Sequence, residues 1–262
     1  DAMQVIGGKL LEYRGRCRVK SCHCHSLLPD SADFAPLWQP KHGRLAMGVD
    51  VGQGQAATVW TAVGRYGVLH KVSRQTPNTA SISGWTIKLA KRWRIAPENI
   101  AIDIGGGGKM IADQLIESGY EVLGVGFGER PNDPSEYNSL RVEMYAEAAK
   151  LMTGSHVQAM VDLPVEKWLP HWSAMGVLPG DSMLRQDLHV LPRDFDGEGK
   201  LRLPPKSRRS SVHGQRSHGS SEKTIEDMLG RSPDDGDSFV LAVYAHRILR
   251  EQDKETTGSY IL

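Results

Sequence analysis

Two short apolar segments, each carrying one aspartate, constrain the fold of this chain more than any other feature of the sequence. Asp50 lies in the run 47–51, and Asp103 lies in the run 101–104. Runs of this length and composition are typical of buried strands. Because an unpaired carboxylate in such a strand costs several kcal/mol, each aspartate requires a metal ion, a cationic partner or a raised pKa.

The order of the predicted elements around these segments indicates an α/β fold. Strands are predicted over residues 44–51, 57–63, 67–72, 99–104 and 120–125. Helices are predicted over residues 83–93, 109–118, 136–152, 182–189 and 235–250, with a hairpin over 190–203. A meander of three strands followed by alternating strands and helices predicts a ribonuclease H-like fold, a mixed five-stranded sheet with helices on both faces. In that sheet the first and fourth strands are neighbours, which brings Asp50 and Asp103 together.

A third carboxylate comes from the start of the last predicted helix. Asp237 begins this helix, next to Asp234 and Asp235. If the helix packs over the sheet, Asp237 joins Asp50 and Asp103, and three carboxylates repel one another unless cations lie between them. Oxygen-only ligands suit Mg²⁺ or Mn²⁺, and two such ions about 4 Å apart catalyse phosphodiester hydrolysis. For Asp234 and Asp235, a role as helix cap or turn residue is favoured.

Charge and composition narrow the class of protein without identifying a partner. The 262 residues have a formal net charge of +1, so no overall field points to a nucleic acid. Basic residues nevertheless gather at 14–20, 88–94 and 200–216, either as solvated surfaces or as the flanks of a DNA groove. The composition predicts a soluble intracellular protein, without an apolar run of the roughly 20 residues that cross a bilayer.

The N-terminal segment and one late loop are predicted to lie outside the regular fold. Residues 1–44 show no sustained hydrophobic period and are predicted to form an arm or linker. Residues 45–262 then form one domain. Within it, the segment 207–221 is rich in Ser, Gly and Arg and is predicted to be a mobile loop.

Two motifs fall short of the spacing that their usual ligands require. Cys17, Cys22 and Cys24 lie beside two histidines, but they are too closely spaced to wrap around a zinc ion, so free thiols are favoured over a structural zinc site. The glycine run 105–108 lacks the spacing and the Ser or Thr of a P-loop, so no ATPase motor is predicted in this chain.

Several segments, in the same order, resemble the nuclease domain of the large terminase subunit of tailed phages and prophages. They are Gly-Val-Asp-Val-Gly-Gln-Gly at 48–54, the segment 103–115 with Gly-Tyr-Glu-Val at 119–122, Phe-Gly-Glu-Arg-Pro at 127–131, and the segments 137–145, 199–206 and 232–239. The resemblance covers about residues 44–250. Each motif is short, and the specificity of the match comes from the ordered set.

This resemblance implies a Mg²⁺- or Mn²⁺-dependent endonuclease that cuts concatemeric double-stranded DNA in the cytoplasm of the bacterial host. It implies that Asp50, Asp103 and Asp237 are the catalytic residues and metal ligands, with Asp234 as an outer or alternative ligand. The residues expected to contact DNA are Lys206, Arg208, Arg209 and Lys109. The portal protein and the small terminase subunit are the implied protein partners.

Three alternatives remain open on the sequence. The segments 48–52 and 103–107 also resemble the phosphate loops of actin-like and sugar-kinase-like ATPases, although those proteins need two such domains and typically more residues. A resolvase-type nuclease with a ribonuclease H-like fold would keep the same metal site. A catalytically inactive DNA-binding or assembly module would keep the fold without the activity.

Overall fold

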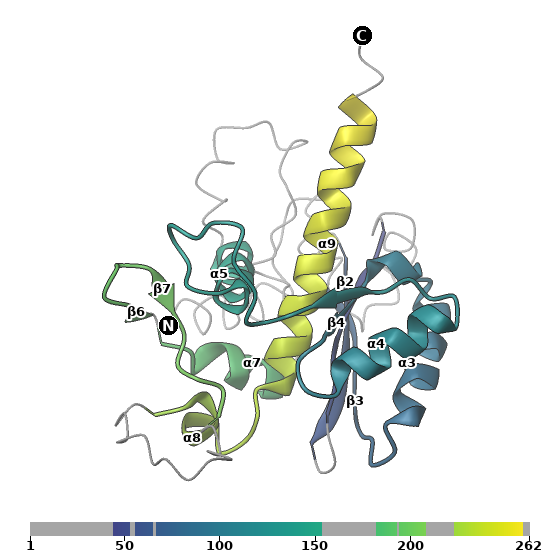
Figure 1. Ribbon diagram of the computed structural model, residues 1–262, viewed down its shortest axis with the longest axis horizontal. Helices are drawn as coiled ribbons and strands as arrows, with labels where there is room; N and C mark the ends of the chain where they lie inside the picture. Colours follow the sequence, from purple (N-terminus) through teal and green to yellow (C-terminus); the bar gives the residue numbers. More distant parts are fainter. Residues whose placement is uncertain are drawn as a thin grey trace, which may run out of the picture.

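A mixed five-stranded sheet forms the centre of the molecule (Figure 1). The structure is a computed structural model that describes residues 44–52, 56–64, 67–153, 182–192, 194–207 and 223–258. The strands of the sheet are β1 (Ala46–Asp50), β2 (Ala57–Gly64), β3 (Gly67–Gln75), β4 (Ile100–Asp103) and β5 (Leu123–Val125). Their spatial order is β3-β2-β1-β4-β5. The first three strands are antiparallel, whereas β4 and β5 join β1 in parallel. The predicted sheet is confirmed.

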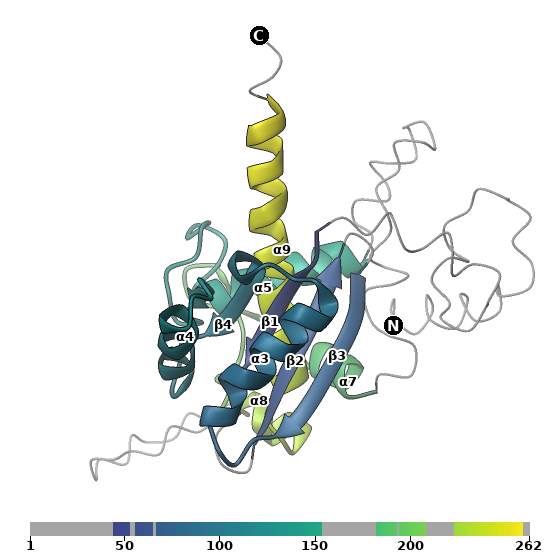
Figure 2. The same ribbon diagram turned by 90° about the vertical axis from the view of Figure 1, so that its right-hand side faces the viewer.

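Helices cover both faces of this sheet (Figures 1 and 2). On one face lie α3 (Ala80–Trp93) and α4 (Gly108–Glu117). On the other lie α5 (Leu140–Thr153), α7 (Ser182–His189) and α9 (Asp234–Gly258). The core is accordingly split into two apolar clusters, one between α3, α4 and the sheet and one between α5, α7, α9 and the sheet.

The alternation of side chains along β1 and β4 decides which face receives the two strand aspartates. Met47 and Val49 belong to the cluster under α3 and α4, whereas Ala46 belongs to the cluster under α9. With a period of two, Asp50 therefore points to the α9 face. The same alternation applies to β4, where Ile100 and Ile102 contact the α3 side and Ala101 the α9 side. Asp103 consequently shares a face with Asp50.

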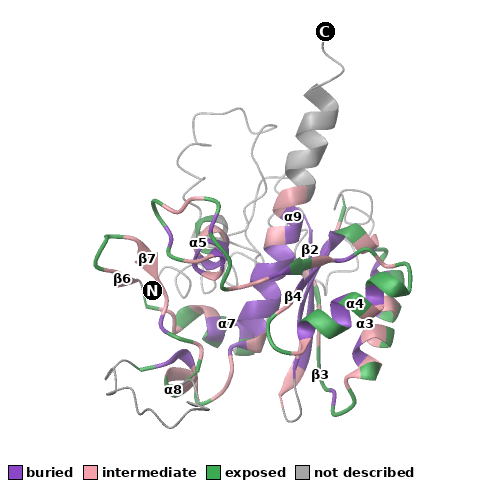
Figure 3. Ribbon diagram, viewed as in Figure 1, coloured by how far each residue is buried: buried purple, intermediate pink, exposed green. Residues whose placement is uncertain are grey.

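A glycine lets α9 approach this face closely. A Cβ atom at Gly48 would collide with the backbone carbonyl of Ser238 and the backbone nitrogen of Ala242. The Ser238 hydroxyl donates to the Gly48 carbonyl at 3.0 Å and lies 3.0 Å from the Thr61 hydroxyl. The start of α9 is therefore fixed against β1 and β2. Figure 3 shows the part of this helix beside the sheet as buried.

One strand and one helix begin several residues later than the sequence pattern predicted. The strand predicted over 120–125 is reduced to β5, because the amide of Tyr120 bonds back to the carbonyl of Leu115 and closes α4. The helix predicted over 136–152 begins only at Leu140. The residues before it pair instead with the segment around Leu201, whose amide donates to the Glu136 carbonyl at 2.7 Å. Tertiary pairing has overridden a local helical pattern here.

Four small elements complete the described part. The 3-10 turn η2 (Pro97–Asn99) leads into β4. The strands β6 (Asp194–Phe195) and β7 (Leu201–Arg202) form the hairpin that was predicted over 190–203. The helix α8 (Ile225–Leu229) precedes α9. The last helix begins one residue before the predicted start and extends beyond the predicted end. No helix among the described residues combines the length and apolarity needed to span a membrane.

Candidate functional site

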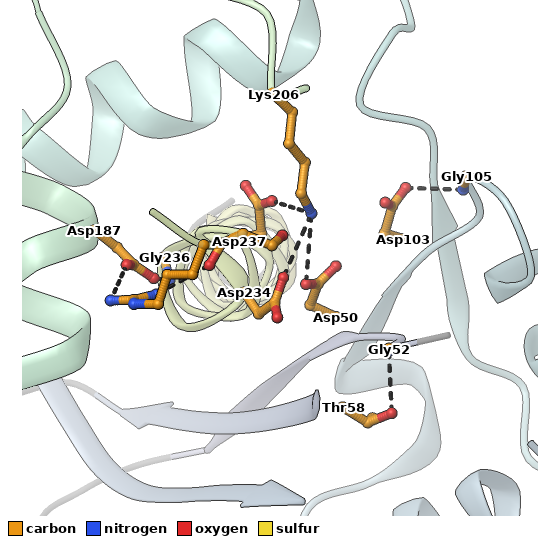
Figure 4. A network of polar contacts seen from close by, with 12 residues as sticks. Asp50, Gly52, Thr58, Asp103, Gly105, Asp187, Lys206, Asp234, Gly236 and Asp237 are labelled. Atoms are coloured by element: carbon orange, nitrogen blue, oxygen red, sulfur yellow. Dashed lines mark hydrogen bonds and ion pairs between the residues drawn. The ribbon is translucent and has the colours of Figure 1, made fainter. Parts of the chain in front are cut away.

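Four aspartates from three elements gather at one end of the sheet (Figure 4). Asp50 is the last residue of β1, and Asp103 is the last residue of β4. These strands are parallel neighbours, and their register pairs Val49 with Ile102, so the two aspartates are level. Asp234 and Asp237 come from the first turn of α9.

The amino group of Lys206 lies among three of these carboxylates. Its Nζ is 2.9 Å from Oδ2 of Asp237, 3.7 Å from Oδ1 of Asp234 and 3.8 Å from Oδ2 of Asp50. Figure 4 shows the lysine reaching in from the side opposite the sheet. Its backbone is held by α8, because the amides of Ile225 and Glu226 donate to the carbonyls of residues 205 and 206.

Asp237 has a second set of partners, from α5. Its Oδ1 accepts hydrogen bonds from Nε and Nη2 of Arg141 at 3.1 and 2.8 Å and from the hydroxyl of Tyr145 at 2.8 Å. The Asp237 side chain is fully buried. One of its oxygens is thus committed to three donors, and only Oδ2 faces Lys206 and the other carboxylates.

Asp103 stands apart from the lysine and is turned towards the following loop. Its Oδ1 accepts the amide hydrogen of Gly105 at 2.9 Å, an interaction drawn in Figure 4. The turn 105–107 then leads directly into α4, whose first residue, Gly108, has no room for a Cβ because the Asp103 carbonyl lies against it.

Burial and mutual repulsion perturb the carboxyl groups in opposite directions. Burial, together with repulsion from Asp237, Asp234 and Asp103, raises the pKa of Asp50 well above its usual value, although Lys206 opposes this. Burial also raises the pKa of Asp103, against the Gly105 amide. For Asp237, burial is outweighed by Arg141 and Lys206, which hold its pKa below the usual value. Asp237 is therefore the fixed anion of the cluster, while the charges on Asp50 and Asp103 are only partly compensated.

The start of α9 is itself held in place by buried charges. Asp187, on α7, accepts the amide hydrogen of Gly236 at 2.9 Å through one oxygen and pairs with Arg231 at 2.6 Å through the other. Lys71, on β3, pairs with Asp235 at 3.0 Å. These contacts fix the helix turn that carries Asp234 and Asp237.

The chemistry of the donors fits a divalent cation, although the lysine lies in their midst. The four aspartates carry four formal negative charges and Lys206 with Arg141 two positive ones, so two negative charges remain. All the available donor atoms are carboxylate oxygens, the ligands that Mg²⁺ and Mn²⁺ prefer. In the described residues, however, no group of three His, Cys, Asp or Glu is arranged to hold a metal ion. The ammonium group of Lys206 occupies the space between Asp50, Asp234 and Asp237, so an ion bound to these three carboxylates would have to displace it.

The other residues predicted at the site are more dispersed. Lys109, on α4, is exposed and pairs with Asp113 at 2.9 Å. Arg208, Arg209, the predicted mobile loop, the N-terminal arm and the three cysteines lie outside the described residues, apart from Arg44 and Ser207 at their edges.

Sequence reasoning gave no role to Arg141, Tyr145 or Asp187. The first two lie in a segment that was matched to terminase nucleases, yet they meet Asp237 across 96 and 92 residues of chain. A usable signal did exist for the first two. Arg141 and Tyr145 are four residues apart on a helix, which places both on one face.

Comparison with solved structures identifies the fold. No protein-family model matches the chain, and no curated protein does so either. The nuclease domain of the large terminase subunit gp2 of bacterial virus Sf6 is similar in structure, with 17% sequence identity, a TM-score of 0.54 and coverage of 76% of this chain and 87% of that chain. A mutant of the same domain, solved with manganese, gives 16% identity, a TM-score of 0.55 and coverage of 79% and 90%. The chain therefore has the ribonuclease H-like fold of these nuclease domains, as predicted.

Proposed function

We propose that this chain is a metal-dependent DNA endonuclease domain of the terminase type, acting on double-stranded DNA. The observation that carries the proposal is the convergence of Asp50, Asp103 and the first turn of α9 at the carboxyl ends of two parallel strands. The ribonuclease H-like fold and the manganese-containing relative support it. The domain is assigned to residues 45–262, with 1–44 as an arm or linker and 207–221 as a mobile loop.

The proposed ions are Mg²⁺ or Mn²⁺. We propose that two of them bind together, because a pair of such ions catalyses phosphodiester hydrolysis. Asp50, Asp103 and Asp237 are the proposed ligands and catalytic residues, with Asp234 as an outer or alternative ligand. Bound ions of this kind activate water and neutralise charge that develops on a phosphate during hydrolysis. Asp237 would offer only Oδ2, because Oδ1 is occupied by Arg141 and Tyr145.

Lys206 has two roles in this proposal. In the ion-free protein its ammonium group offsets the repulsion among Asp50, Asp234 and Asp237. Once ions take over that task, the lysine is free to contact a phosphate of the DNA. Arg208, Arg209 and Lys109 are proposed as further DNA contacts. In a packaging machine the portal protein and the small terminase subunit would be the partners, in the cytoplasm of the host.

The actin-like or sugar-kinase-like alternative has less support. A phosphate-binding loop presents free backbone amides to its ligand. In the turn after β4, the Gly105 amide donates to Asp103 and the Gly108 amide donates to the Gly105 carbonyl at 3.0 Å. Two amides of this turn are thus engaged within the chain. Micromolar affinity for ATP in calorimetry would favour that alternative over the nuclease.

The proposal is tested by incubating the purified chain with supercoiled plasmid and Mn²⁺ or Mg²⁺, with a chelator in a parallel sample. We expect nicked and then linear DNA with the ions and none with the chelator. Single replacements Asp234→Asn and Asp237→Asn, ranked by residual cleavage, identify which helix carboxylate is essential. An intact plasmid after exposure to millimolar Mn²⁺, or equal cleavage in the chelator, would contradict the proposal.

A further inference from the structure

One stretch of the chain contains no acidic residue at all. Between Asp50 and Glu98 there is neither Asp nor Glu, although the whole sequence has 31 acidic residues against 32 Lys and Arg. The same stretch contains seven Lys and Arg residues. The near-neutral total therefore conceals a strongly basic region that comprises β2, β3 and α3.

The fold gathers most of this charge on one outer surface. Arg74, on β3, and Lys88, Lys91 and Arg92, on α3, are all exposed. Spacings of three and four residues place the three α3 side chains on the same side of the helix. Together with Trp85 these residues form what we call the basic face. It lies on the side of the sheet away from α9, as Figure 2 shows for α3.

Trp85 orders two of these cations. The guanidinium carbon of Arg74 lies 3.9 Å from the centre of the Trp85 ring, and Nζ of Lys88 lies 4.6 Å from it. Such contacts contribute about 0.5–1 kcal/mol each at exposed sites. The strand and the helix are thus linked through one indole ring. The positive groups are held in position before any ligand arrives, which lowers the entropy cost of binding.

Local stability explains only part of this arrangement. Lys91 and Arg92 lie in the last turn of α3, where cations interact favourably with the helix dipole. Arg74 and Lys88 have no such position. Among the described residues, none of the four cations pairs with a carboxylate, in contrast to Lys109 on α4, which pairs with Asp113.

The basic face begins at the same end of the sheet as the aspartate cluster. Asp50 pairs with Val59, and Val59 pairs with Ser73, the residue before Arg74. Two strand spacings amount to about 10 Å. From there α3 extends for about 21 Å. A duplex carries one charge per about 1.7 Å of its axis, so a duplex along α3 would present about a dozen phosphate charges.

We propose that the basic face binds the phosphate backbone of double-stranded DNA, outside the aspartate cluster and without regard to base sequence. The proposal rests on the proposed function for the identity of the polyanion. Contacts of this kind position a duplex and raise its affinity without reading the bases.

The experiment measures binding of a fluorescently labelled duplex of about three helical turns by anisotropy, in chelator so that no cleavage occurs, over a series of salt concentrations. The test variant is Lys88→Gln with Lys91→Gln. The control variant is Lys150→Gln with Arg185→Gln, which makes the same charge change at exposed positions of α5 and α7, on the other side of the sheet. Glutamine has a helix propensity close to that of lysine, so α3 should remain folded, and matching unfolding midpoints verify this.

We expect the test variant to bind the duplex about tenfold more weakly, with the salt slope reduced by about two, since each lost phosphate contact removes about one. The control variant should bind within a factor of about two of the parent. Equal affinity and salt slope in the two variants would overturn the proposal. The proposal would also be overturned if the test variant lost affinity only for single-stranded DNA of the same sequence and not for the duplex. If the parent binds but never cleaves, the nuclease function fails while the basic face stands. If the parent cleaves DNA and the test variant binds the duplex as tightly as the parent, the nuclease function stands while the proposal for the basic face fails.

Discussion

The two helical layers of this molecule treat charge in opposite ways. Under α9 and α5, charged side chains are buried and paired, as in the contact of Asp237 with Arg141. Under α3, the buried polar contacts are between neutral groups, such as the Trp60 indole donating to the Thr86 hydroxyl at 2.9 Å. There the charges stay on the outside. Buried charges cost free energy and persist where they are paired, and the α9 layer holds the aspartate cluster that we propose as the metal site. The α3 layer is suited to attracting a polyanion.

The largest expected effect contrasts one aspartate from each side of the sheet. Asp50→Asn should reduce plasmid cleavage by about a thousandfold, because it removes the charge of a proposed metal ligand. Asp113→Asn, on α4, makes the same chemical change at an exposed position. Its rate of plasmid cleavage should stay within about twofold of that of the parent. Ion-free stability of Asp50→Asn should be equal to or above that of the parent, since the raised pKa of Asp50 marks its charge as unfavourable. Equal rates of cleavage by the two variants would show that Asp50 is not part of the active site.

The second effect concerns folding stability and contrasts two arginines. Arg141→Gln leaves the buried carboxylate of Asp237 with fewer partners and should lower the free energy of unfolding by about 3 kcal/mol. Arg92→Gln, on the basic face, should change it by less than about 0.5 kcal/mol. Urea unfolding in chelator measures both. A similar loss of unfolding free energy in the two variants would contradict the distinction between buried, paired charges on the α9 side and exposed charges on the α3 side.

The third effect depends on pH and involves Asp187. Burial raises the pKa of Asp187 to about 6, against the Gly236 amide and Arg231. Since the folded pKa lies above the unfolded value of about 3.9, the folded state binds the extra proton between these values. The contribution of this group to stability is therefore complete below pH 4 and lost as the pH rises through 6. The asparagine side chain of the variant Asp187→Asn resembles the protonated acid. The free energy of unfolding of this variant, relative to that of the parent, should therefore rise by about 1–2 kcal/mol between pH 4 and pH 7.

Denaturant unfolding of both proteins across this pH range checks the third effect, because the difference between them cancels the contributions of the other acids. A difference that stays constant from pH 4 to pH 7 would show that Asp187 has an ordinary pKa. Asp196→Asn, in the exposed β6–β7 turn, is the matched control. It should show no gain of this kind.

The strands and their aspartates were predictable because their signals are local. A carboxylate within the apolar runs around Asp50 and Asp103 indicates a compensated buried charge, and alternation then assigns it to a face. The helix Ser182–His189 and the hairpin around 197–199 were likewise visible from period and glycine positions.

Long-range contacts limited the rest of the prediction. The segment before Leu140 has a helical pattern but pairs with Leu201, and no local rule reveals a partner so distant. Arg141 meets Asp237 across 96 residues. The position of Lys206 among the carboxylates depends on α8, which holds its backbone carbonyl. The family resemblance indicated a basic residue near the site, but not that its ammonium group would lie between the aspartates.

The most direct measurement is calorimetric titration of Mn²⁺ into the purified chain, the Asp50→Asn variant and the Asp113→Asn variant, in the absence of DNA. The parent should bind Mn²⁺ saturably, because the cluster retains two uncompensated negative charges and offers only carboxylate oxygens. Asp113→Asn should match the parent, and Asp50→Asn should bind at least about tenfold more weakly. No saturable binding to the parent at millimolar Mn²⁺, or identical binding by all three proteins, would contradict a metal centre at these aspartates.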